Sequence, residues 1–102
     1  MSQETEKIQA AFQQLAQAVD TGDLDRFKAV AAAPDDVVQE ELFVRNSSKL
    51  RQGGARLRLR GIAQEGDTAE VQFDIIDARG RPLDEGEMTF VALPAGWRVR
   101  EL

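Results

Sequence analysis

The sequence predicts an α+β domain: two or three N-terminal helices packed on one face of a curved four-stranded antiparallel meander sheet. Two observations predict it. Apolar residues recur with a helical period before Gly53-Gly54 and with a period of two after it. All helical segments precede all strands, an order typical of helices gathered on one side of an antiparallel sheet. With 102 residues, the chain is expected to form a single domain over 1–102.

The first two helices follow from apolar spacing and from their end signals. One stripe on the first helix is formed by Ile8, Phe12, Leu15 and Val19. Gly22 is expected to end this helix, and Asp23 to cap the next one directly. The apolar side of that short second helix is formed by Leu24, Phe27, Val30 and Ala31. Pro34 prevents its continuation.

The third segment, 35–52, is expected to be helical after a cap at Asp35 or Asp36. The apolar residues of this segment suit a helix: Val38, Leu42 and Phe43. The stretch ELFVRN could instead be extended, so two interpretations of this segment remain open.

Four segments then alternate apolar and polar residues, as strands with one buried face do. The inward sets are Ala55, Leu57 and Leu59; Ala69, Val71, Phe73 and Ile75; Met88, Phe90 and Ala92; and Trp97 and Val99. Connections are expected at 64–68, 77–86 and 94–96. Because an indole has about 150–250 Å² to bury, Trp97 is expected to anchor the last strand.

Three stretches together resemble the nuclear-transport-factor-2-like superfamily: AVDTGDLDRFKAV, EGDTAEVQFDI and the terminal GWRV. The resemblance covers almost the whole chain and is closest to small bacterial members of unknown function. It implies a cystatin-like cone whose mouth can hold a small hydrophobic ligand, and dimerisation through the sheet. The superfamily also includes ketosteroid isomerases, dehydratases and epoxide hydrolases, so the resemblance does not decide the function.

Composition excludes several kinds of active site. The chain contains no histidine, cysteine or tyrosine, so thiolate chemistry, histidine-based triads and the commonest metal ligands are absent. We therefore predict no catalytic residue, no metal and no cofactor. The net charge of −5 also argues against a general nucleic-acid-binding role.

The positions of the carboxylates favour a non-catalytic domain. Glu70, Asp74 and Glu87 fall on the outward set of their strands, where a period-two element cannot turn them inward. Acids that could reach the mouth of the cone are Asp35, Asp36, Glu40 and Glu41, and helix capping is the favoured interpretation of these. The sequence thus predicts a small-ligand-binding or protein-interaction domain. The alternative is a small carboxylate-dependent isomerase, dehydratase or hydrolase that acts on a hydrophobic substrate.

The candidates for a ligand pocket are the large apolar side chains between sheet and helices: Phe12, Phe27, Phe43, Phe73, Met88, Phe90 and Trp97. Their alternative interpretation is ordinary core, which is favoured because a domain of this size needs most of them for packing.

A basic stretch, residues 45–64, holds six basic residues and no acidic one. Its arginine ladder consists of Arg56, Arg58 and Arg60 on one strand face. We expect cross-strand ion pairs to neutralise the ladder, with Arg60 opposite Glu70 and Arg56 opposite Asp74. In this favoured interpretation a loose patch from Arg45 to Arg51 is left over. The other interpretation is an anion- or nucleic-acid-binding patch.

Partners and location are predicted from the remaining features. Ile76, Val91, Leu93 and Leu102 share the outward parity and are candidates for a homodimer contact through the outer sheet face. No run of about 20 apolar residues is present, so no membrane span is expected. The opening MSQETEKIQ does not resemble a signal peptide and favours the cytoplasm; export would require a signal preceding this sequence.

Overall fold

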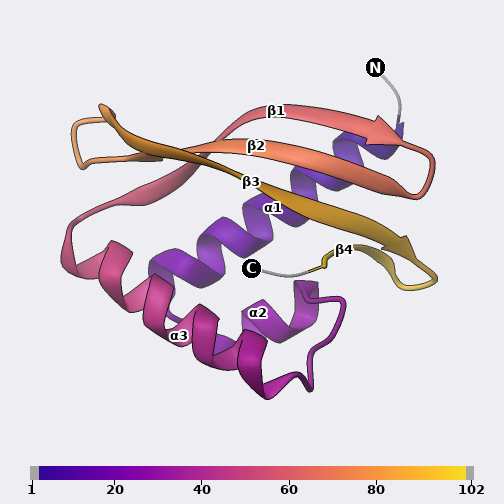
Figure 1. The fold of residues 1–102 in the computed structure, drawn as a ribbon, viewed down its shortest axis with the longest axis horizontal. Coiled ribbons are helices and arrows are strands. Elements are labelled where there is room, and N and C mark those ends of the chain that lie inside the picture. Colours follow the sequence, from indigo (N-terminus) through magenta and orange to yellow (C-terminus); the bar gives the residue numbers. More distant parts are fainter. Residues whose placement is uncertain (1–2, 101–102) are drawn as a thin grey trace.

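The computed structural model describes residues 3–100 as three helices followed by four strands. The elements are α1 (Gln3–Thr21), α2 (Leu24–Val30), α3 (Val37–Gln52), β1 (Arg56–Glu65), β2 (Thr68–Ile76), β3 (Pro82–Leu93) and β4 (Gly96–Val99). The strands form one antiparallel sheet in the order β1-β2-β3-β4, which confirms the predicted α+β meander. The sheet is curved and not closed (Figure 1).

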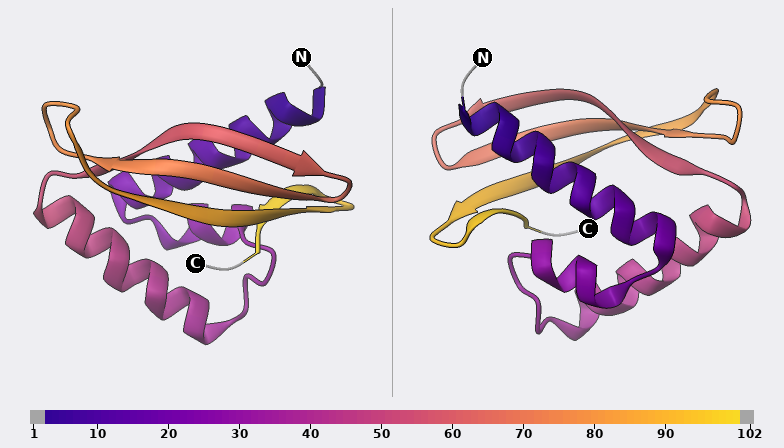
Figure 2. Two further views of the ribbon diagram at one scale, coloured as in Figure 1. Left: turned by 45° about the horizontal axis from the view of Figure 1, so that its top comes forward. Right: turned by 180° about the vertical axis from the view of Figure 1, so that it is seen from behind.

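Helix α1 crosses the sheet diagonally, and α2 and α3 lie beside the C-terminal half of α1 (Figure 2). The predicted stripe of α1 is buried, together with the small residues Ala11, Ala16 and Ala18. Gly22 ends α1 with a φ of +66°, and Asp23 caps α2 by accepting from the backbone N–H groups of Asp25 and Arg26. Both predicted end signals are confirmed.

Helix α3 is continuous, so the extended alternative for ELFVRN is wrong. Its cap is Asp36, whose carboxylate accepts from Val38 N at 2.9 Å and Gln39 N at 3.4 Å. Phe43 is buried as expected. Val38 is 62% exposed and lies on the solvent side of the helix.

The β1–β2 hairpin is tighter than predicted. Only Gly66 and Asp67 form the turn, and Gly66 has the positive φ that a two-residue hairpin needs at its first position. A bulge between Leu59 and Gly61 then shifts the register. The two-residue turn sets Ala63 opposite Glu70, and the bulge then sets Arg58, not Arg56, opposite Asp74. The predicted pairs were therefore wrong.

Strand β3 begins at Pro82, so part of the connection expected at 77–86 is strand. Proline is tolerated at the first position of a strand, where its missing N–H removes no interior ladder bond. Gly86 lies in the strand opposite Phe73.

Ile76 is only 4% exposed, which corrects its expected position on an open outer face. A register irregularity between Ile75 and Ile76 interrupts the β2–β3 ladder. The outward position of Ile76 was predicted from strict alternation of side chains along β2, and this alternation does not continue through such an irregularity. Val91 is half-buried and Leu93 is 41% exposed; Leu102 lies outside the described residues.

The main core lies between α1 and the centre of the sheet. Phe12, Val71 and Phe90 are completely buried there. The segment after α2 lies beside β4, where Ala32 N donates to Val99 O at 2.8 Å and Ala31 forms a parallel bridge. This segment covers the free edge of a four-residue strand that would otherwise be open to unwanted pairing.

Candidate functional site

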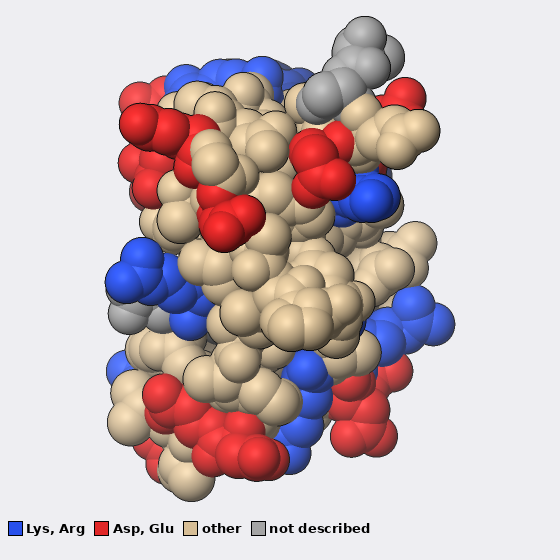
Figure 3. Space-filling model, turned by 90° about the vertical axis from the view of Figure 1, so that its right-hand side faces the viewer, with Lys and Arg blue, Asp and Glu red and all other residues tan. Residues whose placement is uncertain are grey.

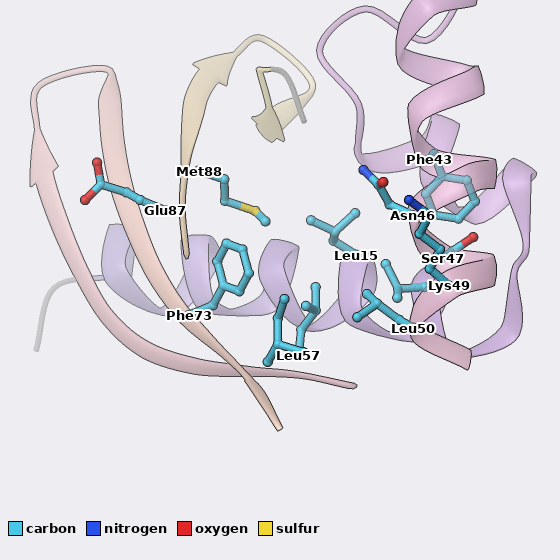
Figure 4. Close-up of a pocket in the computed structure, with 12 residues that line it drawn as sticks. Leu15, Phe43, Asn46, Ser47, Lys49, Leu50, Leu57, Phe73, Glu87 and Met88 are labelled. Atoms are coloured by element: carbon cyan, nitrogen blue, oxygen red, sulfur yellow. The ribbon is translucent and has the colours of Figure 1, made fainter. Parts of the chain in front are cut away.

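A cavity of about 290 Å³ lies between α3 and the adjoining end of the sheet. Its apolar lining comes from two helices and from the sheet: Leu15 and Val19 of α1, Phe43 and Leu50 of α3, Leu57 of β1, Phe73 and Ile75 of β2, and Met88 of β3. Four polar residues complete the lining: Asn46, Ser47, Lys49 and Glu87. Figure 4 shows side chains from the sheet and from α3 on opposite sides of this space.

The cavity exists because α3 stands away from the sheet. α3 packs against α1 and α2 and only sparsely against the strands. At that end of the sheet Leu57, Phe73 and Ile75 belong to the face that carries the helices, yet they are only half-buried. Apolar surface on the core side is thus left partly uncovered, which is the usual property of a small-ligand site.

Gly86 lets Phe73 lie low on the sheet. A Cβ placed on Gly86 would come within 2.6 Å of the Cζ atom of Phe73, so the ring lies directly over this glycine. Phe73 also packs against Phe12, with ring centroids 6.3 Å apart. Any side chain at position 86 would push the ring upward, toward the cavity.

The polar lining residues differ in whether their side chains have hydrogen-bond partners within the protein. Ser47 is 1% exposed, and its hydroxyl donates to Val44 O at 3.3 Å within α3. Asn46 and Lys49 are exposed, and among residues 3–100 neither side chain has a hydrogen bond or an ion pair. The carboxylate of Glu87 accepts from Gln72 Nε2 at 3.1 Å and points away from the other lining side chains (Figure 4).

Three of the seven pocket candidates line the cavity: Phe43, Phe73 and Met88. The other four, Phe12, Phe27, Phe90 and Trp97, lie in the core and not in the lining. Phe27, for example, stacks on Phe43 with ring centroids 4.5 Å apart. The position of α3, on which this division depends, is not readable from the apolar pattern of each element.

Sequence reasoning missed the polar end of the cavity and the role of Gly86. One available signal was the α3 stripe, in which Asn46 and Ser47 interrupt the apolar series from Phe43 to Leu50. Another was a glycine at an inward strand position, which often marks close approach of a neighbouring group.

The four acids that could have reached the mouth of a cone, Asp35, Asp36, Glu40 and Glu41, do not line the cavity. Asp36 caps α3, and Glu40 pairs with Lys28 Nζ at 3.5 Å. Asp35 and Glu41 are exposed. Within residues 3–100 no group of three or more acidic side chains is arranged to hold a metal ion.

The arginine ladder is largely neutralised, though by other partners than those predicted. Arg58 pairs with Asp74 at 3.2 Å, and Arg60 reaches Glu85 on β3 at 2.7 Å. The bulge at Arg60 explains why it reaches across to a third strand. On the face drawn in Figure 3, acidic and basic groups are interspersed and form no continuous basic area.

No family model and no curated protein matches this sequence. Solved structures do match it in three dimensions. An NTF2-like protein from Cytophaga hutchinsonii has a TM-score of 0.61 at 17% identity, with 100% of each chain covered. The chain has the NTF2-like fold.

Two further NTF2-like structures agree. A candidate dehydratase of the NTF2-like family from Streptomyces avermitilis has a TM-score of 0.57 at 16% identity, covering 92% of this chain and 88% of the other. A candidate NTF2-like transpeptidase from Campylobacter jejuni has a TM-score of 0.60 at 12% identity, covering 86% and 92%. At such identities the likeness concerns the NTF2-like fold alone. None of the three described helices is long and apolar enough to cross a bilayer.

Proposed function

We propose that this domain binds a small apolar molecule in the cavity between α3 and the sheet, without catalysing its conversion. The observation that carries the proposal is a space of about 290 Å³ lined mainly by apolar side chains, several of them half-buried. Completing the burial of such surface stabilises a complex by about 25 cal/mol per Å². A bound ligand would supply the contacts that α3 does not make.

The volume bounds the size of the ligand. An engineered apolar cavity of about 150 Å³ accommodates benzene, and ligand pockets start at about 300 Å³. The space in this domain suits a molecule with one to three aromatic rings, or an aliphatic chain of comparable size.

The name of the Streptomyces avermitilis neighbour raises an enzymatic alternative. A carboxylate directed into the cavity would be the observation in its favour. Within the described part of the chain Glu87 is the one carboxylate in the lining, and it is turned away and bonded to Gln72. We therefore propose binding alone.

A neutral fluorescent probe, N-phenyl-1-naphthylamine, tests the proposal. We expect saturable binding of one molecule per chain, and displacement by linear alcohols from butanol to decanol. Each added methylene should strengthen binding about fourfold, until the chain no longer fits and the gain stops. Probe that does not bind, or a gain that continues without limit, contradicts the proposal.

A pair of variants on β1 localises the binding. Leu57→Trp adds volume inside the lining and should weaken probe binding at least tenfold. Leu59→Trp is the matched control, because Leu59 packs against the core from the same strand face but does not line the cavity. Thermal unfolding of both variants checks that the fold is retained. Equal effects of the two substitutions would place the probe elsewhere.

A further inference from the structure

We propose that the ligand is a small amphipathic monocarboxylate, with its apolar tail in the cavity and its head beside Lys49 and Asn46 at the mouth. This inference rests on the proposed binding function and adds the chemical class of the ligand. It follows from the charges at the cavity, from the position of the polar groups and from the absence of a competing acid.

Among residues 3–100 Lys49 is the one cationic residue in the lining, and it is exposed. Lysine commonly lays its aliphatic stem along apolar surface and keeps its ammonium in water. At the rim of an apolar cavity this arrangement offers a positive charge to whatever part of a ligand projects from the mouth.

Asn46 lies three residues before Lys49 on α3, a spacing that places both side chains on neighbouring positions of the helix surface. Its amide has two N–H donors. Figure 4 shows this amide projecting from α3 on the side of the sheet. An ammonium and an amide together provide donors for the two oxygens of one carboxylate.

The N–H donors of Lys49 and Asn46 are not used within the described part of the protein. Neither side chain has a hydrogen bond or an ion pair among the described residues. The one acid in the lining, Glu87, is bonded to Gln72 and points away. The last carbonyls of α3 are occupied by backbone N–H groups, including Ala55 N to Leu50 O at 2.8 Å. The ammonium of Lys49 is therefore available to an external anion.

The donor set also limits the charge of the head group. One ammonium and one amide suit a single negative charge, whereas phosphate sites usually add arginine forks or a row of backbone N–H groups. An apolar tail together with a monoanionic head describes a medium-chain fatty acid or an arylalkanoic acid.

Three matched probes test the charge of the head: octanoate, 1-octanol and octylamine, each measured by displacement of N-phenyl-1-naphthylamine at neutral pH. Octanoate should bind about tenfold more tightly than octanol, the lower range of what a charge-assisted hydrogen bond contributes. Octylamine should bind more weakly than octanol. The preference should decrease with added salt, because the head lies near solvent.

Charge removal on α3 locates the preference. Lys49→Gln should abolish the advantage of octanoate over octanol while leaving octanol binding unchanged. Arg45→Gln is the control, because it removes another exposed cation one turn earlier on α3 that does not line the cavity. If Lys49 serves only the C-terminal end of the helix, Lys49→Gln lowers stability without changing the preference, and the inference is wrong.

The outcomes separate the two proposals. If octanol binds and octanoate has no advantage, the binding function stands and the carboxylate inference fails. If neither octanol nor the neutral probe binds, the binding function fails, whatever the charged probes do at the surface. Octanoate binding that Lys49→Gln and Arg45→Gln weaken equally would indicate general attraction to α3 and also overturns the inference.

Discussion

Trp97 links the last strand to the first helix. Its indole is 4% exposed, lies opposite Ala92 on β3 and donates from Nε1 to Glu4 Oε2 at 2.7 Å. That hydrogen bond is the main reason the pKa of the Glu4 carboxyl lies below its ordinary value, because it stabilises the charged form, with Lys7 adding to the effect. The apolar ring of Trp97 is thus buried, and its one polar atom has a hydrogen-bond partner.

The Glu4–Trp97 bond predicts a pH dependence. Since the pKa of Glu4 is lowered on folding, its stabilisation is fully present above the ordinary value of 4.5 and is lost as pH falls through the lowered folded pKa. Trp97 emission, the only tryptophan signal in the chain, should change over that acidic range before global unfolding.

Two variants check this assignment. Glu4→Gln keeps an acceptor for the indole but cannot titrate, so the acidic emission change should disappear. Asp77→Asn is the control. The pKa of Asp77 is also lowered, chiefly by the hydrogen bond that its carboxylate accepts from the Arg81 backbone N–H. Asp77 lies in the β2–β3 turn and is not bonded to Trp97, so this variant should keep the emission change. A wild-type emission change that survives in Glu4→Gln would contradict the assignment.

At the scale of elements, α3 packs against α1 and α2, and one of its contacts lies at the turn between these two helices. The guanidinium of Arg51 lies over Gly22: a Cβ placed there would come within 2.5 Å of its Cζ atom. Arg51 Nε also donates to Ser47 O at 3.3 Å, which holds the side chain along α3. Gly22 thus allows both the positive φ at the end of α1 and the close approach of Arg51 from α3.

Gly22→Ala is therefore expected to destabilise the domain by more than the cost of its backbone conformation. A non-glycine residue with positive φ costs about 1–2 kcal/mol, and Arg51 must also move. Gly54→Ala is a matched control, with a φ of +68° against +66° and open space around the Cβ position. Urea unfolding should give a larger loss for Gly22→Ala than for Gly54→Ala. Equal losses would mean that the Arg51 contact contributes nothing.

The whole molecule is a flat structure of about 36 × 30 × 16 Å with helices on one side of the sheet and an outer sheet face on the other. Paired charges such as Arg58 with Asp74 cover much of that outer face. With Ile76 buried, Leu93 is the exposed apolar residue left of the dimer candidates. A homodimer through this face stays a proposal.

If the outer face does dimerise, Leu93→Glu should shift the mass in solution from dimer to monomer, because it places a charge in the contact. Light scattering after size-exclusion chromatography measures the mass, and circular dichroism checks the fold. Ile76→Glu is unsuitable because it would bury a charge within the monomer. Wild-type protein that is monomeric at high micromolar concentration would exclude this dimer.

Local pattern alone was enough to predict α1, α2, the four strands apart from the start of β3, and the burial of Trp97, whereas for α3 it left an extended alternative open. The stripe on α1, the caps at Gly22 and Asp23 and the alternation in β2 each depend on residues within a few positions of one another. Such preferences act before distant parts of the chain meet, so they can be read in sequence order.

The irregularities and the cavity were decided only by tertiary structure. The bulge at Leu59–Gly61 moved Arg60 to Glu85, and the irregularity before Ile76 ended the alternation there. The space beneath α3 lies between elements that meet through residues far apart in sequence, such as Arg51 over Gly22 and Phe73 over Gly86. Periodicity determines which side of an element is buried. How closely two elements approach depends on the side-chain volumes that meet between them, and only the folded chain brings those together.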